Sequence, residues 1–314
     1  MPPMPKAMLI HNPVAGPRNI QREVAAVATH IRRHGWTVDV QQTERPGDAT
    51  ALARAAAEAG YDAAIAAGGD GTVNEVVNGL VGTQTALGVL PVGVGNLWAK
   101  QIGLPTYTLA NPLRLHDAAE AFVSGSVRAI DVGRVNGRYF LCWAGIGLDA
   151  QVTWEMEPRA RHTKRLGILP YVVATITVAQ DFPGFRTRVS LDGSVVRGRA
   201  LLVLVSNIQR YCGIYVGSET LVDDGLLDVF VFKGLGFSYA VSHMLKMLSR
   251  RHLQDPRVIH RKARHIVVET EAATPVQVDG DPFGHTPVVV EVVPRALRIV
   301  VPPKAPPSLF SACA

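Results

Sequence analysis

A glycine-rich turn around one acidic residue is the first part of the chain that could do chemistry. Gly68, Gly69, Asp70 and Gly71 follow residues 63–67, which are apolar enough for a short buried strand. Glycines let the backbone approach a ligand closely, and the free N–H groups at a helix start attract phosphate. An aspartate beside phosphate needs a cation between them, which is the role of Mg²⁺ in phosphoryl transfer. The alternative is a plain tight turn with an exposed acid, and three glycines make that interpretation the weaker one.

An amphipathic helix is predicted directly after this turn. Apolar residues recur at helical spacing from Val73 to Leu80. Thr72 and Glu75 have the spacing of a capping box, so we expect these two side chains to cap the first turn of the helix. The whole stretch therefore predicts a strand, a glycine turn and a helix.

The elements that must position this turn alternate between strand and helix over residues 1–128, which is typical of a parallel α/β domain. Strands are predicted at 8–10, 36–40, 63–67 and 85–90, and further helices at 20–35, 46–60 and 111–124.

Residues 129–301 predict a second, mostly antiparallel domain of the β-sandwich type, so the fold class is α/β with two domains. Asn136-Gly137 and Asp192-Gly193 are two-residue hairpin signals. The proline-rich residues 302–314 are expected to form a poorly ordered tail. Further strands are predicted at 200–205, 226–232, 266–268, 276–278, 288–293 and 297–301, and helices near 167–180 and 237–250.

Composition supports a two-domain globular protein. The 314 residues exceed a usual single core, and 47% hydrophobic with 18% charged residues excludes a disordered chain. A net charge of +6 suits a polyanionic ligand, an anionic membrane or nucleic acid, without choosing among them. The three cysteines form neither a disulfide framework nor a zinc pattern, which predicts a reducing cytoplasm. Neither a signal peptide nor an apolar run of about 18 residues is present, so we expect a soluble or peripheral protein.

Several other patterns are weaker. Residues 145–150, GIGLDA, fit a dinucleotide motif, but no acid lies about 20 residues further on, so we interpret them as a packing turn. His30 and His34 could ligate a metal from one helix face. With no third ligand near them in sequence, we expect a solvated face instead. Walker A, HExxH and GxSxG motifs are absent, which argues against a P-loop enzyme, a zincin and a serine hydrolase.

Four motifs, HNPVAG, GGDGTVNE, PVGVGNLWAK and VQVDGD, occur in the order found in the diacylglycerol kinase catalytic family. The chain resembles that family, which includes bacterial soluble lipid kinases and sphingosine kinases, from Asn12 to about Val301. GGDGT alone also occurs in NAD kinases and phosphofructokinases, whereas the four motifs together are specific. The resemblance implies a nucleotide domain and a β-rich domain, with ATP and a lipid hydroxyl meeting in the cleft between them.

The resemblance also implies which residues bind the nucleotide. Val94 replaces a threonine of the family pattern, so its hydroxyl contact is lost, and Leu97 stands where many bacterial diacylglycerol kinases have aspartate. The implied contacts are Asn12, Pro13, Val14, Ala15 and Gly16 in a first loop, Thr43 after the second strand, Gly68, Gly69, Asp70, Gly71, Thr72, Val73, Asn74 and Glu75 in the triphosphate loop, and Gly93, Val94 and Asn96 in a third loop.

Two further acids gain a role only through the resemblance, because each otherwise looks like a turn residue. Asp224 corresponds to a ligand of a structural Mg²⁺, with Leu221 and Leu226 contributing backbone carbonyls. Asp281 stands in place of the glutamate general base and is one methylene shorter. Asp70 is the alternative general base, and it is also the expected contact of the catalytic Mg²⁺.

A basic segment precedes the apolar helix predicted near 167–180. Arg159, Arg161, Lys164 and Arg165 suit docking on anionic lipid, where each charge adds roughly 1 kcal/mol. A core helix beside a solvated basic loop explains the pattern equally well. The lipid substrate implied by the resemblance favours docking.

These observations predict an ATP- and Mg²⁺-dependent kinase that phosphorylates a hydroxyl of a diacylglycerol- or sphingoid-like lipid. The alternatives are an NAD kinase and a catalytically silent regulator that binds nucleotide or lipid. We expect a cytoplasmic protein that associates peripherally with an anionic membrane surface and has no nucleic-acid partner. The sequence leaves a homodimer open.

Overall fold

The structure is a computed structural model that describes residues 4–16, 20–93, 95–106, 114–156, 169–211, 213–217 and 219–311. The chain divides into two compact units. Unit 1 comprises Met1–Ile130 and Arg295–Pro307, and unit 2 comprises Asp131–Pro294 and Ser308–Ala314. Strands β5 (Ser126–Val135) and β17 (Val288–Val301) each run from one unit into the other. Unit 1 is therefore built from two segments of the chain, whereas the sequence predicted one continuous stretch.

Unit 1 contains a parallel sheet in the order β4-β3-β1-β2. Its strands are β1 (Lys6–His11), β2 (Thr37–Gln42), β3 (Ala63–Gly68) and β4 (Ala86–Pro91). The last part of β17 joins β4 in parallel, with Ile299 opposite Leu87. Every residue of β3 is buried, as expected for a central parallel strand covered on both faces. The predicted parallel α/β domain is confirmed.

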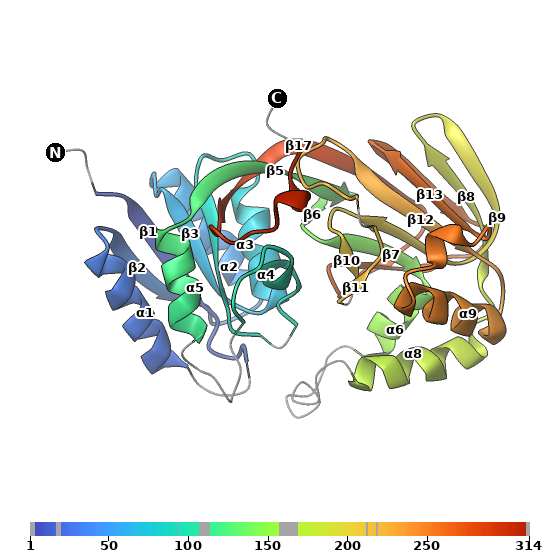
Figure 1. Cartoon of the computed structure of the whole chain (residues 1–314), viewed down its shortest axis with the longest axis horizontal. Helices are drawn as coiled ribbons and strands as arrows, with labels where there is room; N and C mark the ends of the chain where they lie inside the picture. The colour runs from blue at the N-terminus through green and yellow to red at the C-terminus, as the bar shows by residue number, and fades with distance from the viewer. Residues whose placement is uncertain are drawn as a thin grey trace. The chain divides into compact units, whose positions relative to one another are not determined.

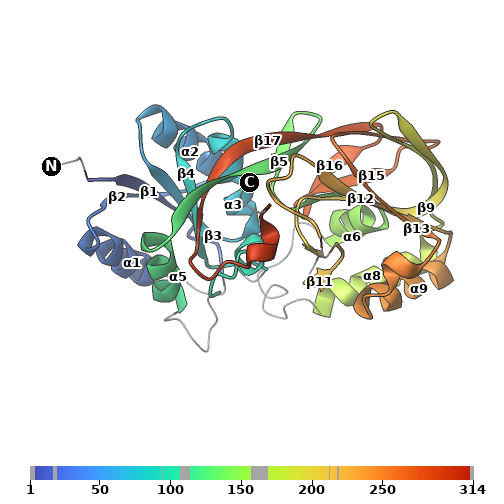
Figure 2. The same ribbon diagram turned by 45° about the horizontal axis from the view of Figure 1, so that its top comes forward.

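Helices cover both faces of this sheet (Figures 1 and 2). Helices α1 (Gln21–Arg33) and α5 (Arg114–Val123) lie side by side on one face, where Ile31 and Phe122 pack against Leu9 and Ile65. Helices α2 (Asp48–Glu58) and α3 (Asp70–Leu80) lie together on the other face. A Cβ on Gly79 of α3 would lie 2.5 Å from the carbonyl oxygen of Thr50, so this glycine allows α2 and α3 to pack closely.

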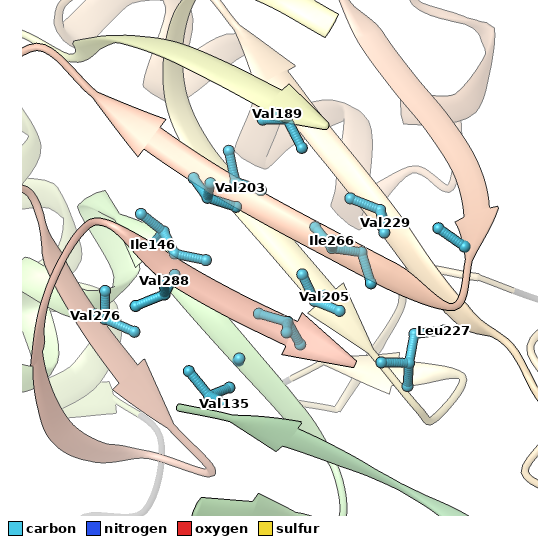
Figure 3. Packing of buried hydrophobic residues seen from close by; sticks show 14 of the residues in the cluster. Val135, Ile146, Val189, Val203, Val205, Leu227, Val229, Ile266, Val276 and Val288 are labelled. Atoms are coloured by element: carbon cyan, nitrogen blue, oxygen red, sulfur yellow. The ribbon is translucent and has the colours of Figure 1, made fainter. Parts of the chain in front are cut away.

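Unit 2 is built on antiparallel strands in the order β16-β15-β7-β9-β8-β14-β17, and β12 pairs with β9 and β13. Aliphatic side chains from these strands form its core, among them Val203, Val205, Val229 and Ile266 (Figure 3). The strands are β6 (Arg138–Phe140), β7 (Trp143–Gly147), β8 (Phe185–Leu191), β9 (Ser194–Ser206), β10 (Arg210–Tyr211), β11 (Ile214–Tyr215), β12 (Leu227–Lys233), β13 (Val258–Ala263), β14 (His265–Thr270), β15 (Pro275–Val278) and β16 (Asp281–His285).

Both hairpin signals of unit 2 are confirmed. Asn136 and Gly137 connect β5 to β6 with φ of 43° and 95°, and Asp192 and Gly193 connect β8 to β9 with φ of 46° and 92°. Positive φ at both turn residues is what a type I′ hairpin requires, and Asn, Asp and Gly tolerate it best. The predicted strands at 288–293 and 297–301 are instead one continuous strand, β17, in which Arg295 has a φ of 50°.

The described part of unit 2 includes the helices α6 (Leu148–Met156), α8 (Leu169–Asp181), α9 (Phe237–Leu248) and the short η1 (His252–Gln254). Helices α8 and α9 lie side by side in both views (Figures 1 and 2). Among the described residues, no helix combines the length and the apolar composition needed to span a membrane.

The prediction of a poorly ordered tail is wrong for residues 302–311. Residues Pro307–Leu309 form a short 3₁₀ helix, η2, and the side chains of Leu309 and Phe310 are buried. The carbonyl oxygen of Leu309 accepts the N–H of Val222 at 2.9 Å, and the N–H of Ser311 donates to Asp223 at 2.6 Å. Two apolar side chains and these hydrogen bonds hold residues 308–311 in unit 2.

Candidate functional site

The carboxyl ends of the parallel strands in unit 1 bring the predicted nucleotide loops to one edge of the sheet. Strand β1 lies between β2 and β3, so the loops that leave β1 and β3 run to opposite sides of the sheet. In open α/β sheets this topological switch point is where ligands bind. The loop after β1 begins at Asn12, and the glycine turn begins after β3, which places both at the switch point.

Asn12 joins the first loop to the glycine turn. Its Nδ2 donates to Thr72 Oγ1 at 3.0 Å, and its Oδ1 accepts the N–H of Val14 at 3.0 Å. Its own N–H donates to the carbonyl of Ala67 at 3.1 Å, on the neighbouring strand. One side chain therefore sets the spacing between two loops that the sequence could only place separately.

Glycines bring the loops into backbone contact. A Cβ on Gly93 would lie 2.5 Å from the Cα of Gly69, and a Cβ on Gly16, whose φ is +78°, would lie 2.8 Å from the carbonyl oxygen of Val92. Gly68 packs against the side chain of Thr72. Substitution at these positions would push the loops apart, because real Cβ atoms do not approach that closely.

Gly71 differs from its neighbours because a Cβ there would meet no described atom within 4 Å. We expect Gly71→Ala to leave the melting temperature unchanged and to weaken ATP binding about tenfold or more, since a methyl group would overlap a phosphate held by this turn. Gly93→Ala should instead lower the melting temperature, because it forces backbone apart. Calorimetric titration with ATP and thermal melts of both variants check this. Unchanged ATP affinity in Gly71→Ala would exclude the turn as a phosphate site.

Asp70 is the first residue of α3, and its carboxylate also holds the start of α4 (Leu97–Gln101). Its Oδ1 accepts the N–H of Leu97 at 2.6 Å, and its Oδ2 lies 2.5 Å from the place where a Cβ of Gly95 would be. Burial raises the pKa of Asp70, and the N–H groups of Leu97 and Asn96 and the charge of Lys100 oppose the shift. The residue thus has a structural role, and its second carboxylate oxygen lies beside Gly95 of the third loop. A hard carboxylate oxygen at this place fits Mg²⁺ bound together with phosphates.

The capping-box prediction is wrong. Gly69 is the N-cap of α3, and no side chain caps this helix. Thr72 accepts the hydrogen bond from Asn12 described above, and a Glu75 carboxylate oxygen accepts the N–H of Ala49 in α2 at 3.1 Å. Glu75 therefore ties α3 to α2, and its carboxylate is directed at that helix.

The other predicted nucleotide residues of unit 1 are mostly buried supports of the loops. Val73 and Asn74 are buried in the first turns of α3. Asn96 is buried with a φ of 48°, and its Nδ2 donates to the carbonyl of Gly93 at 2.5 Å, which closes the third loop. Val94 lies outside the described residues. Thr43 is buried after β2, and its N–H donates to the carbonyl of His11 at 3.0 Å.

His11, at the end of β1, is a buried residue that the sequence analysis did not single out. Its Nε2 has no hydrogen-bond partner among the described residues, and burial lowers its pKa. It lies directly before Asn12, the residue that begins the first loop. An aromatic, titratable residue ending a buried strand is the sequence signal that could have marked it.

Acid should destabilise the protein through His11. Below about pH 6.5 the unfolded chain takes up a proton at this histidine, while the folded chain with its lowered pKa does not. Stability is therefore lost as the pH falls, by up to about 1.4 kcal/mol per pH unit from this one group. The urea midpoint of the wild type should fall relative to that of His11→Gln between about pH 7.5 and pH 5.5. A midpoint difference that does not change with pH would contradict the assignment.

In unit 2 the predicted base Asp281 is half-exposed at the start of β16. Its Oδ2 lies 2.5 Å from Nη2 of Arg138, and its side chain is 47% exposed. The Arg138 guanidinium also lies 5.8 Å from the centre of the Phe283 ring. An accessible carboxylate held by one arginine can accept a proton from a substrate if the arginine moves or shares its hydrogen bonds.

Asp279, two residues earlier, fixes the turn that presents Asp281. Its carboxylate accepts the N–H groups of Leu141, Cys142 and Trp143 at 2.8, 2.9 and 2.8 Å. Burial raises the pKa of Asp279 to about 6, against the effect of these three hydrogen bonds and of Arg138. Its φ of 50° places it in the left-handed region together with Gly280. Asp279 is therefore the structural acid of the VDGD motif, which leaves Asp281 as its accessible one.

Asp149 is a candidate that the sequence analysis missed. The interpretation of residues 145–150 as a packing turn is wrong in its secondary structure, because Gly145 lies in β7 and α6 begins at Leu148. Close packing does occur there, since the missing side chain of Gly145 makes room for Asp149 and Gln277. Asp149 itself is buried and accepts hydrogen bonds from the hydroxyl of Tyr211 and, at 2.5 Å, from Nε2 of Gln277. Gln277 Oε1 in turn accepts the N–H of Gly280 at 2.8 Å, so this network supports the turn before Asp281. The sequence signal that could have identified Asp149 is the presence of an acidic residue within the otherwise apolar residues 145–150.

The residues around Asp224 do not fit the Mg²⁺ that the resemblance implies there. Asp224 Oδ1 accepts the N–H of Leu226 at 3.1 Å, and Oδ2 accepts Nζ of Lys262 at 2.8 Å. Nζ of Lys262 also donates to the carbonyl of Glu219 at 3.3 Å. Burial alone would lower the pKa of Lys262, but the acids around it raise it. The Lys262 ammonium therefore supplies the positive charge beside Asp224, at the place where the Mg²⁺ would otherwise lie.

The predicted basic docking segment with Arg159, Arg161, Lys164 and Arg165 lies outside the described residues. The helix that follows it, α8, is described from Leu169. Its exposed apolar side chains Val173 and Ile176 are accompanied by Leu245 and Leu248 on the adjacent α9. Two packed helices of unit 2 thus expose aliphatic side chains to solvent.

Comparison with known proteins agrees with this geometry. Residues 6–135 match the diacylglycerol kinase catalytic domain, and residues 143–301 match the YegS C-terminal NAD kinase beta sandwich-like domain. The chain belongs to the diacylglycerol kinase catalytic-domain family, as its four motifs predict.

The relatives that match nearly the whole chain are named as diacylglycerol kinases. A diacylglycerol kinase of Bacillus subtilis (strain 168) is 29% identical over 302 residues, covering 95% of this chain and 97% of that protein. One of Staphylococcus haemolyticus is 28% identical and covers 94% of this chain and 88% of the relative. The crystal structure of a diacylglycerol kinase from Bacillus anthracis str. Sterne superposes with a TM-score of 0.75 at 27% identity, covering 96% of this chain and 98% of the other. These relatives support a phosphotransferase.

Proposed function

We propose that this protein transfers the γ-phosphoryl group of ATP to a hydroxyl of a diacylglycerol-like lipid. The observation that carries the proposal is the junction of the three glycine-containing loops around Asp70 at the switch point of unit 1. In a chain of this family, free N–H groups and one carboxylate at this junction suit the binding of a nucleoside triphosphate and its metal ion.

Unit 1 supplies the groups that hold the phosphates. The helix start at Gly69 and Asp70 offers N–H groups, and the open space at Gly71 lets phosphate oxygens approach the backbone. Asn12 and Thr72 keep the first loop and the turn at a fixed spacing. Asp70 would hold Mg²⁺, which when bound neutralises charge on the β- and γ-phosphates. Most of the rate enhancement then comes from alignment and charge stabilisation.

Asp281 is the proposed proton acceptor. The lipid hydroxyl oxygen attacks the γ-phosphorus, the bond from that phosphorus to the β-phosphate oxygen breaks, and ADP leaves. The hydroxyl proton passes to a carboxylate oxygen of Asp281, and Arg138 holds that carboxylate before the substrate arrives. Asp279 and the Asp149–Gln277 network fix the turn on which Asp281 is carried.

The lipid is drawn from a membrane surface in this proposal. The exposed aliphatic side chains of α8 and α9 support it, because a soluble enzyme must extract an insoluble substrate. The net charge of +6 favours an anionic surface. The relatives' names favour diacylglycerol over a sphingoid base as acceptor. Leu97 packs at the start of α4, where its N–H binds Asp70, so its side chain is not needed for that contact.

The proposal is tested by measuring ADP release with ATP, Mg²⁺ and one acceptor at a time: diacylglycerol, a sphingoid base or NAD⁺. We expect release with diacylglycerol that exceeds release without acceptor. Release with NAD⁺ alone would identify an NAD kinase. No release with any acceptor, together with measurable ATP binding, would identify a silent nucleotide-binding regulator. Either result would overturn the proposed lipid kinase activity.

A further inference from the structure

A cluster of imidazole and carboxylate groups lies on the outer side of α1 and α5 in unit 1. The expectation that His30 and His34 lack a third metal ligand is wrong, because Glu120 of α5 reaches both of them. His116, one turn before Glu120, brings a third imidazole ring against His30. Each helix thus contributes two side chains of the cluster four residues apart, which is the spacing of side chains on one helix face.

The distances between these side chains are close to those of a metal site. His30 Nε2 lies 2.9 Å and His34 Nε2 lies 3.8 Å from the same oxygen, Glu120 Oε2. The ligand atoms of the three residues all lie within 4.8 Å of one another. Ligands on a tetrahedron around Zn²⁺ lie roughly 3.3 Å apart, given metal–ligand distances of about 2.0 Å. Side-chain shifts of about an ångström or less would therefore complete the geometry.

The tautomer of His34 is already the one that a metal ligand needs. Its Nδ1 lies 2.9 Å from the carbonyl oxygen of His30. A carbonyl oxygen only accepts hydrogen bonds, so Nδ1 carries the proton and Nε2 presents a lone pair toward Glu120. Metal-bound histidines are typically oriented in this way, by a hydrogen bond from the other ring nitrogen to a backbone carbonyl.

We propose that His30, His34 and Glu120 bind one divalent transition-metal ion of the zinc type. Two imidazole nitrogens and one carboxylate oxygen are ligands that Zn²⁺ accepts, whereas Mg²⁺ prefers oxygen ligands and near-octahedral geometry. The ion bridges α1 and α5, whose ligands His30 and Glu120 are 90 residues apart in sequence. Its expected effect is to stabilise unit 1. His116 positions the ring of His30, with 4.1 Å between the ring centres, and leaves the fourth metal position to water.

The test uses the full chain without a polyhistidine tag, stripped with a chelator and titrated with ZnCl₂ by calorimetry. We expect one ion per chain, and a rise in melting temperature on adding zinc. His34→Ala and Glu120→Gln should each weaken zinc binding at least about a hundredfold. The His34 and Glu120 side chains are 42% and 53% exposed, so the variants should keep the fold, which circular dichroism checks.

His265→Ala provides the matched control, because His265 is an exposed histidine on β14 in unit 2. It should bind zinc like the wild type. The proposal is overturned if the wild type takes up no zinc, or if His34→Ala and Glu120→Gln bind it as tightly as His265→Ala does. Neither readout depends on kinase activity, so failure of the lipid kinase proposal would leave this result unaffected.

Discussion

Replacing Asp70 with asparagine should abolish phosphoryl transfer, with a fall in kcat of at least about a thousandfold, while the protein stays folded. Asparagine keeps an oxygen that can accept the N–H of Leu97, so the start of α4 is preserved. It loses the negative charge that would hold Mg²⁺ beside the phosphates. The measurement is steady-state ADP release with saturating lipid and increasing Mg²⁺.

Glu58→Gln is a suitable control for this variant, because Glu58 is an exposed acid of the same unit at the end of α2. It removes one negative charge from unit 1 and should leave kcat unchanged. Circular dichroism and melting temperature should be similar for both variants and the wild type. An Asp70→Asn protein with the wild-type rate would remove Asp70 from the metal site and leave it only its role in holding α4.

Asp281→Asn should lower kcat by at least about a hundredfold if Asp281 is the general base. Asparagine keeps the size of the side chain and an oxygen for Arg138, but it cannot accept a proton at neutral pH. ATP affinity should be nearly unchanged, since the proposed role concerns the lipid hydroxyl. Single-turnover rates and ATP titrations of the same preparation separate the two effects.

Asp281→Glu is the informative companion, because it restores the glutamate of the family pattern and should retain substantial activity. Asp279→Asn should behave differently from both, since Asp279 binds three backbone N–H groups and its loss should lower the melting temperature. Normal turnover in Asp281→Asn would show that Asp70 or solvent takes the proton.

The glycine loops were the most predictable part of the site, for a physical reason. Gly68, Gly69 and Gly71 act through their own backbone, so their role can be predicted from the local sequence without knowledge of the fold. A continuous apolar run located β3, and periodic apolar residues located α3, from local sequence in the same way. The convergence of Asn12 on Thr72 was implied only by the family resemblance, because 60 residues separate them.

Partners of charged side chains were the least predictable part. Glu75 has capping-box spacing with Thr72, yet its carboxylate binds the backbone of α2, which packs beside α3 in the tertiary structure. Asp224 lies next to Lys262 although 38 residues separate them, and the sequence alone suggested a metal ion only by resemblance. A long charged side chain can reach several possible hydrogen-bond partners, and the tertiary structure determines which of them lie close to it.

Composition misled the prediction at the carboxyl end. Prolines dominate residues 302–308 and indicated disorder, but Leu309 and Phe310 are buried, and the carbonyl of Ser308 accepts Nε2 of Gln209 at 2.8 Å. Two buried apolar residues are enough to anchor a short segment. The average composition of the segment does not show them, because prolines dominate it.

The most direct test of the proposed function follows the phosphate itself. Purified protein is incubated with ATP labelled at the γ-phosphate, Mg²⁺ and diacylglycerol in mixed micelles, and the lipid is then extracted and counted. We expect label in a phosphorylated lipid with the wild type and none above background with Asp70→Asn. Label that stays in ATP or appears only as inorganic phosphate, while the protein binds ATP, would contradict a lipid kinase.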